Sequence, residues 1–426
     1  MAKKEQVPAI RFQGFADPWE QRKFNDVFSI LQNCTLSRAE LSYDNGEAFN
    51  IHYGDVLIKF GEVIDAETAL LPRITDEKIV ASFRSSALQD GDIIIADTAE
   101  DEAVGKCAEM LNLQEKTAIS GLHTIPVRPT ARFATGYLGY FMNSPAFHDQ
   151  LLPLMQGTKV TSVSKSALQD TVISFPSERA EQGQIGRYFM ALDTLITLHQ
   201  RKYDKLVAIK RSMLEKMFPR EGSRFPEIRF AGFTDPWEQR KLGEVASSFE
   251  YGLNAAAKEF DGVNKYLRIT DIDDVSREFR EDDLTSPDTD LSAASNYQLH
   301  NGEILFARTG ASVGKSFIYR ESDGLVYFAG FLIRARIRPE HDAEFVFQNT
   351  LGLPYEKYIQ VTSQRSGQPG VNAQEYAEYS FMVPSLAEQK SIGSFLHQID
   401  TLITLHQRKL EKLQAIKRSM LEKMFV

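Results

Sequence analysis

The sequence predicts an α+β protein with a pseudo-two-fold internal duplication, in which two mixed α/β domains are joined by two long antiparallel coiled-coil helices. Two repeats predict this fold. A lead at residues 8–23 returns at residues 226–241, with 13 of 16 positions identical. A helical segment at residues 192–218 returns at residues 399–425, with 23 of 27 positions identical. The segments between these copies differ widely, so a duplicated frame carries two unlike domains.

The two repeats enclose segments of unequal length. The leads are offset by 218 residues and the helical copies by 207, so the first enclosed segment is 11 residues longer than the second. Near-identical ends around unequal segments are typical of modules that can be exchanged. We expect a first domain with its lead at 1–184, a first spacer helix at 185–219, a second domain with its lead at 220–387, and a second spacer helix at 388–426.

Each lead is followed by short runs of β type. Asp17-Pro18 and Asp235-Pro236 in the leads are typical of a turn or of a helix start, with Asp as the cap and Pro at the first helical position. The runs after them are punctuated by Gly, Asn, Asp and Pro, which predicts strands in both domains. They read NIHYGDVLIKF, DGDIIIAD, NGEILFAR, YFAGFLIRARI and AEYSFMVPS. Residues 88–106 also align with residues 299–315, so the domains themselves are diverged copies.

Each repeat ends in a segment whose seam residues are spaced alternately four and three apart. Sustained spacing of this kind, with charges on the other faces, predicts a coiled coil, and two such helices in one chain pair most simply in antiparallel fashion. A helix of roughly 34 residues would be about 50 Å long. The spaced residues are Ile185, Phe189, Leu192, Ile196, His199, Tyr203, Leu206, Lys210, Met213 and Met217, then Ile392, Ile399, Ile403, His406, Leu410, Leu413, Lys417, Met420 and Met424.

Polar residues interrupt this seam at the same places in both copies. One interpretation of the His and Lys positions is a polar layer that sets the register or docks a partner. The other, which we favour on the sequence alone, is a long side chain that reaches from the seam edge into water. The apolar residues at the helix ends are docking patches if exposed, and cap a core if buried. The seam or partner-docking candidates are His199, Tyr203, Lys210, Met217, Phe218, His406, Leu410, Lys417, Met424 and Phe425.

Composition and charge narrow the class of protein. A hydrophobic content of 42% and a charged content of 25% are ordinary for a globular protein, and no apolar run approaches a membrane span. The opening MAKKEQVPAI lacks the apolar core of a signal peptide, so we expect a cytoplasmic protein without a membrane partner. Cys34 and Cys107 are too few for a disulfide framework or a zinc cluster. The net charge of −9 argues against holding nucleic acid by bulk charge alone.

The sequence lacks the motifs of an independent enzyme. An adenine methyltransferase needs an N-P-P-Y-like loop and a Gly-rich cofactor loop, and neither occurs here. The run Gly310–Ser316 has three residues between its glycines, where a P-loop needs four. The acidic run Pro287–Asp290 reads as a polar loop rather than a metal site. We therefore expect no catalytic residue, no metal and no cofactor on this chain.

Three motifs carry a family resemblance. The lead GF-[AT]-DPWEQRK and the helical segment LITLHQRK…AIKRSMLEKMF each occur twice, and residues 302–315 read GEILFARTGASVGK. Over nearly its full length the chain resembles the specificity subunit of type I restriction–modification systems. The first domain departs from the third motif, because Asp97 stands in the place of Arg308 and Ala99 in the place of the following glycine. A role given to Arg308 therefore does not transfer to the first domain.

The resemblance implies a reader and scaffold rather than a catalyst. Each domain would be a target-recognition domain that reads one half of a split, asymmetric sequence in double-stranded DNA. The helices would bind two modification subunits, which are adenine methyltransferases that carry S-adenosylmethionine, and would space the half-sites. Restriction (translocase) subunits that use ATP and Mg would complete the nuclease. Two other functions stay open: a partner-independent DNA-binding regulator and a coiled-coil protein adaptor.

Polar loops in both domains are candidates for DNA contacts. Arg308 and Lys315 flank a small-residue loop that could approach phosphates, although a tight turn between strands would also explain its glycines. The loop at 362–370 carries Arg and Gln, which suit guanine and adenine in the major groove, and residues 155–165 are its counterpart. Both loops could equally be plain solvated loops. The candidates are Arg308, Thr309, Lys315, Gln364, Arg365, Gln368, Gln156, Thr158, Lys159, Lys165 and Lys106. Residues 187–218 add a local net charge of +4, which suits DNA, an acidic partner or plain solvent.

Overall fold

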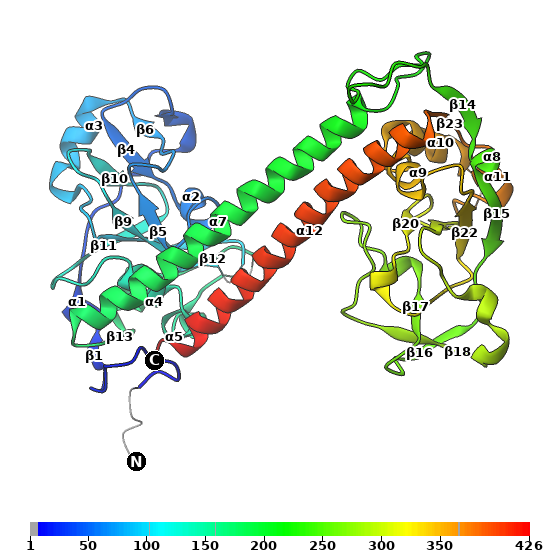
Figure 1. The fold of residues 1–426 in the computed structure, drawn as a ribbon. Helices are drawn as coiled ribbons and strands as arrows, with labels where there is room; N and C mark the ends of the chain where they lie inside the picture. Colours follow the sequence, from blue (N-terminus) through cyan, green and yellow to red (C-terminus); the bar gives the residue numbers. More distant parts are fainter. Residues whose placement is uncertain (1–6, 102, 158, 365–366) are drawn as a thin grey trace. The chain divides into compact units, whose positions relative to one another are not determined.

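The computed structural model describes residues 7–101, 103–157, 159–364 and 367–426. It divides into two compact units: unit 1 holds the residues up to Leu198 together with 410–426, and unit 2 holds 199–409. Each unit combines one α/β domain with part of each long helix, α7 (Arg179–Lys216) and α12 (Leu386–Lys423) (Figure 1). Both helices begin slightly before the expected boundaries at 185 and 388. In the described part of the chain, no helix has the length and apolarity needed to cross a bilayer.

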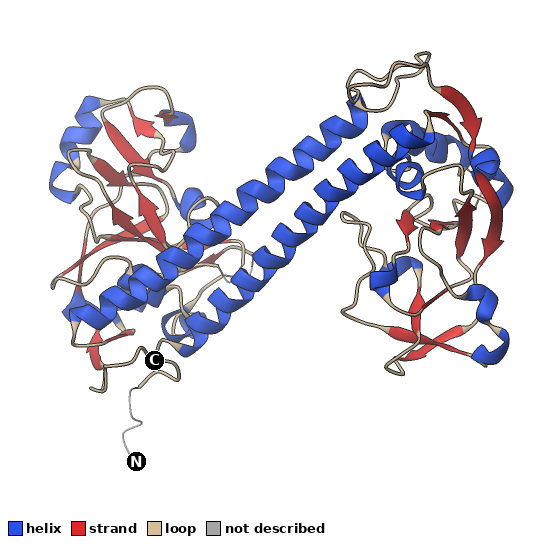
Figure 2. Ribbon diagram, in the orientation of Figure 1, coloured by secondary structure: helices blue, strands red, loops and turns tan. Residues whose placement is uncertain are grey.

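Unit 1 is built around a five-stranded sheet with strand order β2-β11-β7-β9-β5 and a four-stranded sheet with order β10-β4-β6-β3 (Figure 2). The strands of the first sheet are β2 (Phe28–Ile30), β11 (Thr124–Pro129), β7 (Ile93–Ala96), β9 (Cys107–Leu111) and β5 (Val63–Asp65). Those of the second are β10 (Ala118–Ser120), β4 (Ala48–Ile51), β6 (Arg73–Ile74) and β3 (Leu41–Ser42). Two short pairs join β1 (Glu20–Lys23) to β13 (Val172–Phe175) and β12 (Thr161–Ser162) to β8 (Thr98–Ala99). The short helices are α1 (Phe24–Val27), α2 (Tyr53–Ile58), α3 (Glu77–Ser82), α4 (Tyr137–Met142), α5 (Pro145–His148) and α6 (Lys165–Gln169).

Unit 2 is built around a four-stranded sheet with strand order β15-β22-β19-β20. Its strands are β15 (Ala246–Tyr251), β22 (Leu332–Ile337), β19 (Ile304–Ala307) and β20 (Ser316–Ile318). Three pairs join β14 (Glu238–Lys241) to β23 (Ser380–Val383), β16 (Ala256–Glu259) to β18 (Thr285–Asp288), and β17 (Lys265–Leu267) to β21 (Val326–Phe328). The short helices are α8 (Leu242–Val245), α9 (Ala343–Asn349), α10 (Leu353–Thr362) and α11 (Ala373–Ala377).

The two domains share one framework despite their different sequences. The order β2-β11-β7-β9 in unit 1 corresponds to β15-β22-β19-β20 in unit 2, and every neighbouring pair in both runs is antiparallel. Both domains also contain parallel strands: β4 pairs with β10 and β5 with β9 in unit 1, and β17 pairs with β21 in unit 2. The predicted α+β fold class with internal duplication is therefore confirmed.

One local expectation from the sequence is wrong, and for the Asp-Pro pairs the structure excludes the helix start but not the turn. The run NIHYGDVLIKF is strand only up to Ile51, and α2 begins at Tyr53 because the His52 imidazole accepts a hydrogen bond from the Gly54 N–H at 3.2 Å and caps the helix. The Asp-Pro pairs in the leads do not start helices. Each lead passes instead into a strand, β1 or β14, which pairs with β13 or β23.

The ends of the long helices are buried in the two cores. Met424 and Phe425 are 3% and 5% exposed and lie in the aromatic core of unit 1 beside Trp19. Met217 and Phe218 are 2% and 9% exposed and lie in the core of unit 2 beside Trp237. Of the two alternatives that the sequence left open for these four residues, the structure therefore supports burial in a core and not exposed docking patches.

The leads fasten each domain to a long helix in the same way. Arg11 forms two hydrogen bonds with Glu181 in α7, at 2.7 and 2.8 Å, and Arg229 forms the same two with Glu388 in α12, at 2.7 and 2.8 Å. Paired bonds between a guanidinium and a carboxylate are strong and fix the geometry of both side chains. Each domain is thereby held rigidly on the helix that follows it in the sequence.

The polar seam residues have partners on the opposite helix or the adjacent domain. In unit 1, Lys417 Nζ lies 2.6 Å from both Glu62 and Asp193, and in unit 2 Lys210 forms an ion pair with Asp400. The favoured interpretation, a long side chain that reaches into water, is therefore wrong for both lysines. The two helices run antiparallel within each unit, and the ion pairs of Lys417 with Asp193 and of Lys210 with Asp400 fix their register.

The remaining seam candidates lie on the same face. His199 and His406 meet in unit 2 with Nδ1 atoms 2.8 Å apart, so one imidazole donates to the other. Tyr203 packs against the core of unit 2, and its equivalent in the other helix, Leu410, is half-buried. The polar layer that sets the register is therefore the interpretation that the structure supports.

Candidate nucleic-acid interface

In unit 2 the backbone of Arg308 joins two loops that the sequence analysis had named separately. Arg308 directly follows β19, and its N–H donates to the Phe331 carbonyl at 3.1 Å. Its carbonyl accepts from the Val371 N–H at 2.9 Å. Thr309 forms a β-bridge with Gly370, so the turn after β19 and the polar loop after α10 form one surface.

The Arg308 side chain is held between two aromatic rings. Its guanidinium lies 5.1 Å from the Tyr251 ring centre and 5.7 Å from that of Phe331, and Phe331 is 60% exposed. The Nε atom is buried without a hydrogen-bond partner among the described residues. Stacking on rings orients the planar guanidinium while its other N–H donors can bind a ligand. Neither Tyr251 nor Phe331 was a candidate from the sequence: Phe331 lies in a run that reads simply as a strand, and no motif marks Tyr251.

The glutamines of the polar loop lie at the same surface. Gln364 and Gln368 are exposed, and a Cβ added to Gly310 would lie 3.2 Å from the Gln368 Nε2 atom. Gln368 is thus a direct neighbour of the turn that begins at Arg308. The remaining candidate of this loop, Arg365, lies outside the described residues.

Lys315 is not available to DNA, contrary to the expectation. Its side chain is buried, and Nζ donates to the Ile272 carbonyl at 3.1 Å and forms an ion pair with Asp274. Most of the other amides of the turn are also engaged within the domain. The N–H groups of Gly310, Val313, Gly314 and Lys315 all donate to backbone carbonyls. The tight-turn interpretation therefore explains the glycines, and Gly314 has a φ of +84° and a Cβ position 2.5 Å from Ile359.

Unit 1 repeats the Arg308 backbone geometry at Asp97. The Asp97 N–H donates to the His123 carbonyl at 3.1 Å, and its carbonyl accepts from the Val163 N–H at 2.9 Å. Strand β8, which follows Asp97, pairs with β12 in the loop that the sequence named as the counterpart. Asp97 and His123 are therefore the structural equivalents of Arg308 and Phe331.

At this place unit 1 carries a carboxylate and an imidazole, from Asp97 and His123, where unit 2 carries a guanidinium and a phenyl ring, from Arg308 and Phe331. Asp97 Oδ1 lies 3.4 Å from His123 Nδ1 and accepts from the Thr98 hydroxyl at 2.7 Å. His123 in turn meets the Tyr53 ring edge-on, with ring centres 5.2 Å apart. His123 also has a φ of +54°, a left-handed conformation that is rare outside glycine and often marks a functional position. The one sequence signal for this cluster was the departure from Arg to Asp.

Lys106 has a structural role instead of the expected DNA contact. Its Nζ donates to the carbonyls of Leu57 and Phe60, at 2.9 Å each, and burial lowers the pKa of this amine. It aligns with Lys315, which also binds a backbone carbonyl of its own domain. The two lysines fasten the turns to neighbouring segments and leave the outer face of each turn to other side chains.

The other first-domain candidates are exposed. Gln156 pairs with Ser162 through two backbone hydrogen bonds of 3.0 and 2.8 Å, which closes the loop that carries Lys159. Lys165 is the first residue of α6, after the capping Ser164. These three residues remain predictions as DNA contacts, and Thr158 lies outside the described residues.

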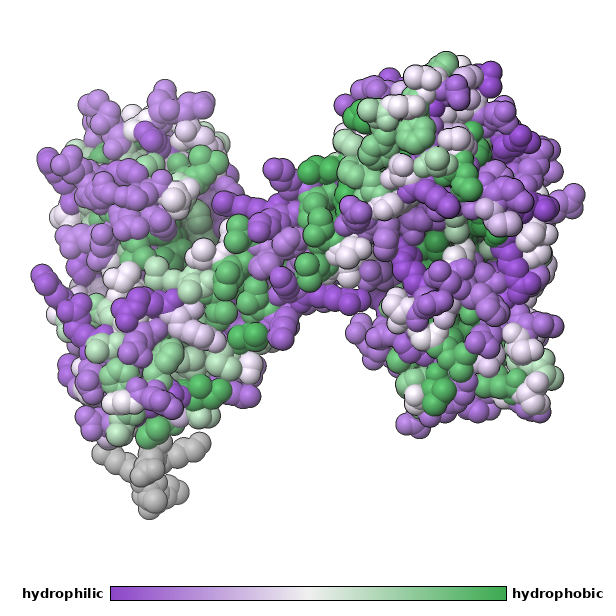
Figure 3. Space-filling model, viewed as in Figure 1, coloured by the Kyte–Doolittle hydropathy of each residue, from purple (hydrophilic) through white to green (hydrophobic). Residues whose placement is uncertain are grey.

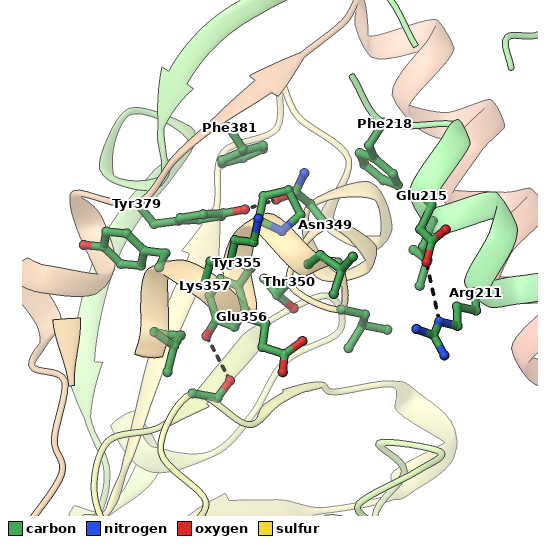
Figure 4. Close-up of a pocket in the computed structure, with 18 of the residues that line it drawn as sticks. Arg211, Glu215, Phe218, Asn349, Thr350, Tyr355, Glu356, Lys357, Tyr379 and Phe381 are labelled. Atoms are coloured by element: carbon green, nitrogen blue, oxygen red, sulfur yellow. Dashed lines mark hydrogen bonds and ion pairs between the residues drawn. The ribbon is translucent and has the colours of Figure 1, made fainter. Parts of the chain in front are cut away.

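Unit 2 also contains a wide cleft of about 2100 Å³, lined in part by the end of α7 and by α10 (Figure 4). Arg211 and Glu215 form an ion pair on one wall at 3.4 Å, and the Tyr379 hydroxyl donates to Asn349 at 2.8 Å on another. Of the candidate DNA residues in this unit, Lys315 lines the cleft, whereas Arg308, Gln364 and Gln368 do not. The cleft and the Arg308 site are thus separate features of unit 2.

Comparison with known proteins connects this arrangement to one family. The model of the type I restriction modification DNA specificity domain matches residues 16–208 and again residues 234–415. The type I restriction enzyme MjaVIII specificity subunit of Methanocaldococcus jannaschii is 24% identical over 275 residues, which are 62% of this chain and 64% of that protein. The putative MjaX specificity subunit of the same organism is 22% identical over 209 residues, which are 47% of this chain and 48% of that protein. The alignments thus span less than two thirds of either relative.

A solved structure shares the fold. The crystal structure of the type I restriction-modification system S subunit from M. genitalium superimposes with a TM-score of 0.64, at 14% identity and over 99% of both chains. At this identity the similarity shows the fold alone.

Proposed function

The chain belongs to the family of type I restriction modification DNA specificity domains, and from this premise we propose that it is the sequence-specificity subunit of a type I restriction–modification complex. Each domain reads one half of a split, asymmetric double-stranded DNA target. The observation that carries the proposal is the pair of equivalent turns at Asp97 and Arg308, which have the same backbone hydrogen bonds and unlike side chains. Such a frame allows two similar domains to recognise two different base sequences.

The proposal assigns the chemistry to partner subunits. Adenine methylation with S-adenosylmethionine belongs to two modification subunits, and ATP- and Mg-dependent cleavage to restriction (translocase) subunits. This chain supplies recognition and a scaffold and has no catalytic residue. Its net charge of −9 supports a division of labour in which partner subunits contribute much of the attraction to DNA phosphates.

Two equivalent apolar patches on the long helices support the docking of two copies of one partner. Leu195 and Leu198 in unit 1 are 43% and 45% exposed, and their counterparts Leu402 and Leu405 in unit 2 are both 44% exposed. Figure 3 shows apolar surface along the long helices. Exposed leucines one turn apart are typical of a protein interface.

Replacing both leucines of one patch by Asp should remove one modification subunit. The variant Leu402→Asp/Leu405→Asp is expected to bind one copy where the wild type binds two, as measured by native mass spectrometry of the complex. The matched control is Thr401→Asp/Lys409→Asp, which places two acids at exposed positions of the same helix without removing a leucine. Retention of two copies by the leucine variant would contradict this docking site.

The methylation pattern tests the proposed function. The chain is expressed with its modification subunit in a host without native DNA methylation, and the genome is read by single-molecule sequencing. The expected result is a bipartite N6-methyladenine motif, one half of which changes when residues 24–180 are exchanged for those of another specificity subunit. If both proteins associate and no motif appears, the specificity function is wrong and a protein adaptor is favoured. Tight sequence-specific binding by this chain alone would favour a partner-independent regulator.

The helices are expected to set the spacing of the two half-sites. Inserting one heptad into both α7 and α12 lengthens each by about 10 Å and keeps the seam in phase. We expect the unspecified spacer in the methylated motif to lengthen by about three base pairs, or methylation to be lost. An unchanged spacer would exclude the helices as the ruler. Seven residues inserted into the exposed loop after Pro219 are the control, because they leave both helices intact.

A further inference from the structure

The equivalent turns place one residue of each domain at the same position in space relative to its sheet. At both positions the N–H donates at 3.1 Å to the backbone carbonyl of the residue just before the neighbouring strand of the sheet, β11 or β22. The carbonyl of the same residue accepts at 2.9 Å from the N–H of a valine in the second loop. The turns that follow are closed by equivalent hydrogen bonds. The Gly105 N–H donates to the Ala96 carbonyl at 2.8 Å, and the Gly314 N–H donates to the Ala307 carbonyl at 2.9 Å. The backbone therefore fixes where Asp97 and Arg308 project, and the domains differ in what projects there.

The side chain of Arg308 suits a guanine base. Guanine presents two acceptors, O6 and N7, on its major-groove edge, and a guanidinium held flat can donate to both at once. Tyr251 and Phe331 hold Arg308 in this way, and its buried Nε lacks a partner among the described residues. A phosphate is the competing ligand, because phosphate also accepts two hydrogen bonds from arginine.

At the equivalent position of the first domain, phosphate is not a competing ligand, because Asp97 is acidic. A carboxylate repels phosphates, so a base amino group is the DNA group from which Asp97 could accept a hydrogen bond. Cytosine offers its N4 amino group in the major groove, whereas the N6 amino group of adenine lies next to the N7 acceptor, which repels a carboxylate. The contacts to Thr98 and His123 both use Oδ1 of Asp97, so the lone pairs of Oδ2 can serve a base.

We propose that this shared position determines one base in each half of the target, with Asp97 taking a cytosine and Arg308 a guanine. The proposal rests on the proposed function, that is, on the chain being a DNA specificity subunit. His123 and the pair Tyr251 and Phe331 are positioning residues, because they hold the reading side chain and need not touch the base.

The test uses variants of the full chain in complex with its modification subunit. Arg308→Lys keeps the charge and loses the bidentate fork, whereas Arg308→Ala loses both. Asp97→Asn keeps the shape and can pair with adenine, and Asp97→Ala removes the acceptor. The controls are Glu100→Gln, which removes an exposed acid three residues beyond Asp97, and Lys258→Ala, which removes an exposed cation of unit 2. Methylated motifs are read by single-molecule sequencing, and binding to matched and single-base-changed duplexes is measured against salt concentration.

The expected result is a loss of discrimination at one base of one half-site. Arg308→Lys and Arg308→Ala should each lower the preference for guanine by about ten- to a hundredfold and leave the half-site of unit 1 unchanged. Asp97→Ala should relax one cytosine of the other half-site, and Asp97→Asn should shift it towards adenine. Glu100→Gln and Lys258→Ala should leave the motif as in the wild type.

Other outcomes overturn the proposal. If Arg308→Lys keeps the motif while Arg308→Ala weakens all sequences equally and lowers the salt dependence by about one ion, Arg308 is a phosphate anchor. If Asp97→Ala and Asp97→Asn methylate the wild-type motif, Asp97 reads no base. Absence of any motif for the wild type would instead refute the proposed function itself, so the two failures are distinguishable. A variant that no longer binds the modification subunit is replaced by His123→Ala or Phe331→Ala, which should lower discrimination at the same base.

Discussion

The turn at Asp97 and the turn at Arg308 differ in charge and in length, but they share the backbone hydrogen bonds that anchor them. Both are closed by a glycine that donates to the strand before it, and both are fastened by a lysine, Lys106 or Lys315, that donates to a backbone carbonyl. None of these contacts uses the side chain of residue 97 or 308. The comparison teaches that the backbone anchors do not depend on the side chain they present, so the residue at this position can change sign while the anchoring hydrogen bonds are kept.

In both units the end of a long helix buries a phenylalanine among aromatic rings, but this residue contacts more rings in unit 1 than in unit 2. Phe425 lies within 6.3 Å, between ring centres, of Trp19, Tyr137, Phe141 and Phe189 in unit 1. In unit 2, Phe218 has two such neighbours, Trp237 at 6.2 Å and Phe345 at 5.4 Å. If the domains are independent copies of one design, equivalent substitutions should act on one unit each and differ in size as these contacts do.

The largest effect is expected from the buried phenylalanines. Phe425→Ala should destabilise unit 1 by about 4 kcal/mol and Phe218→Ala should destabilise unit 2 by about 3 kcal/mol, because fewer rings surround Phe218. The chain has two tryptophans, and Trp19 lies in unit 1 and Trp237 in unit 2. Urea unfolding followed by fluorescence in a Trp237→Phe background therefore reports on unit 1, and in a Trp19→Phe background on unit 2. An equal loss in both units from either substitution would show that the units unfold together.

A smaller effect is expected from the arginines of the leads. Arg229→Ala leaves the buried Glu388 without its paired donors, which costs about 3 kcal/mol. Arg11→Ala should cost about 1 kcal/mol less, because the Trp19 indole N–H still donates to Glu181 at 3.4 Å, whereas the Trp237 indole N–H has no partner among the described residues.

The lead substitutions have two internal checks. Adding Glu388→Gln to Arg229→Ala should restore part of the loss, because an uncharged amide tolerates burial better than a lone carboxylate. Arg22→Ala, which removes an exposed ion pair with Glu20, should change the unfolding free energy by less than about 1 kcal/mol. A loss from Arg11→Ala as large as that from Arg229→Ala would rule out the role given to the Trp19 indole.

The smallest effect is the pH dependence that the imidazole pair contributes to unit 2. Burial, followed by the proximity of His199 and two lysines, lowers the pKa of His406. A histidine whose pKa is lower in the folded than in the unfolded state stabilises the fold above its unfolded pKa of about 6.5, and this contribution is lost as the pH falls through the folded value. Unit 2 should therefore lose stability between pH 7 and pH 5 by fluorescence in the Trp19→Phe background. His199→Leu/His406→Leu should remove part of this dependence, and an unchanged slope would count against the imidazole pair.

The frame could be predicted from the sequence because repeats are visible without a structure. The seam residues of the helices, the duplicated halves and the alignment of Asp97 with Arg308 all follow from comparing the chain with itself. The long-range partners could not be predicted. Lys106 meets the carbonyls of Leu57 and Phe60, and no local signal in the sequence distinguishes such a lysine from one that awaits a phosphate.

The Arg308 site was only half predictable for the same reason. Arg308 stood out by its motif, but Tyr251 ends strand β15 and Phe331 directly precedes strand β22, and both join Arg308 only through the sheet. The burial of Phe218 and Phe425 was likewise undecided, because an apolar helix end looks the same in a core and at a docking surface. Turn residues such as Gly314 and Lys315 were visible, but their purpose depends on distant neighbours, Ile359 and Ile272.

The polar seam carries a record of ancestry. His199 meets His406, which is its own copy, while Lys210 pairs with Asp400 and Lys417 pairs with Asp193, so the lysine of each copy meets the aspartate of the other. Reciprocal contacts of this kind are the mark of an isologous interface between identical subunits. The reciprocal contacts are those expected if two copies of one half pair with each other within a single chain. Because both copies lie in one chain, each can change separately, as the difference between Asp97 and Arg308 illustrates.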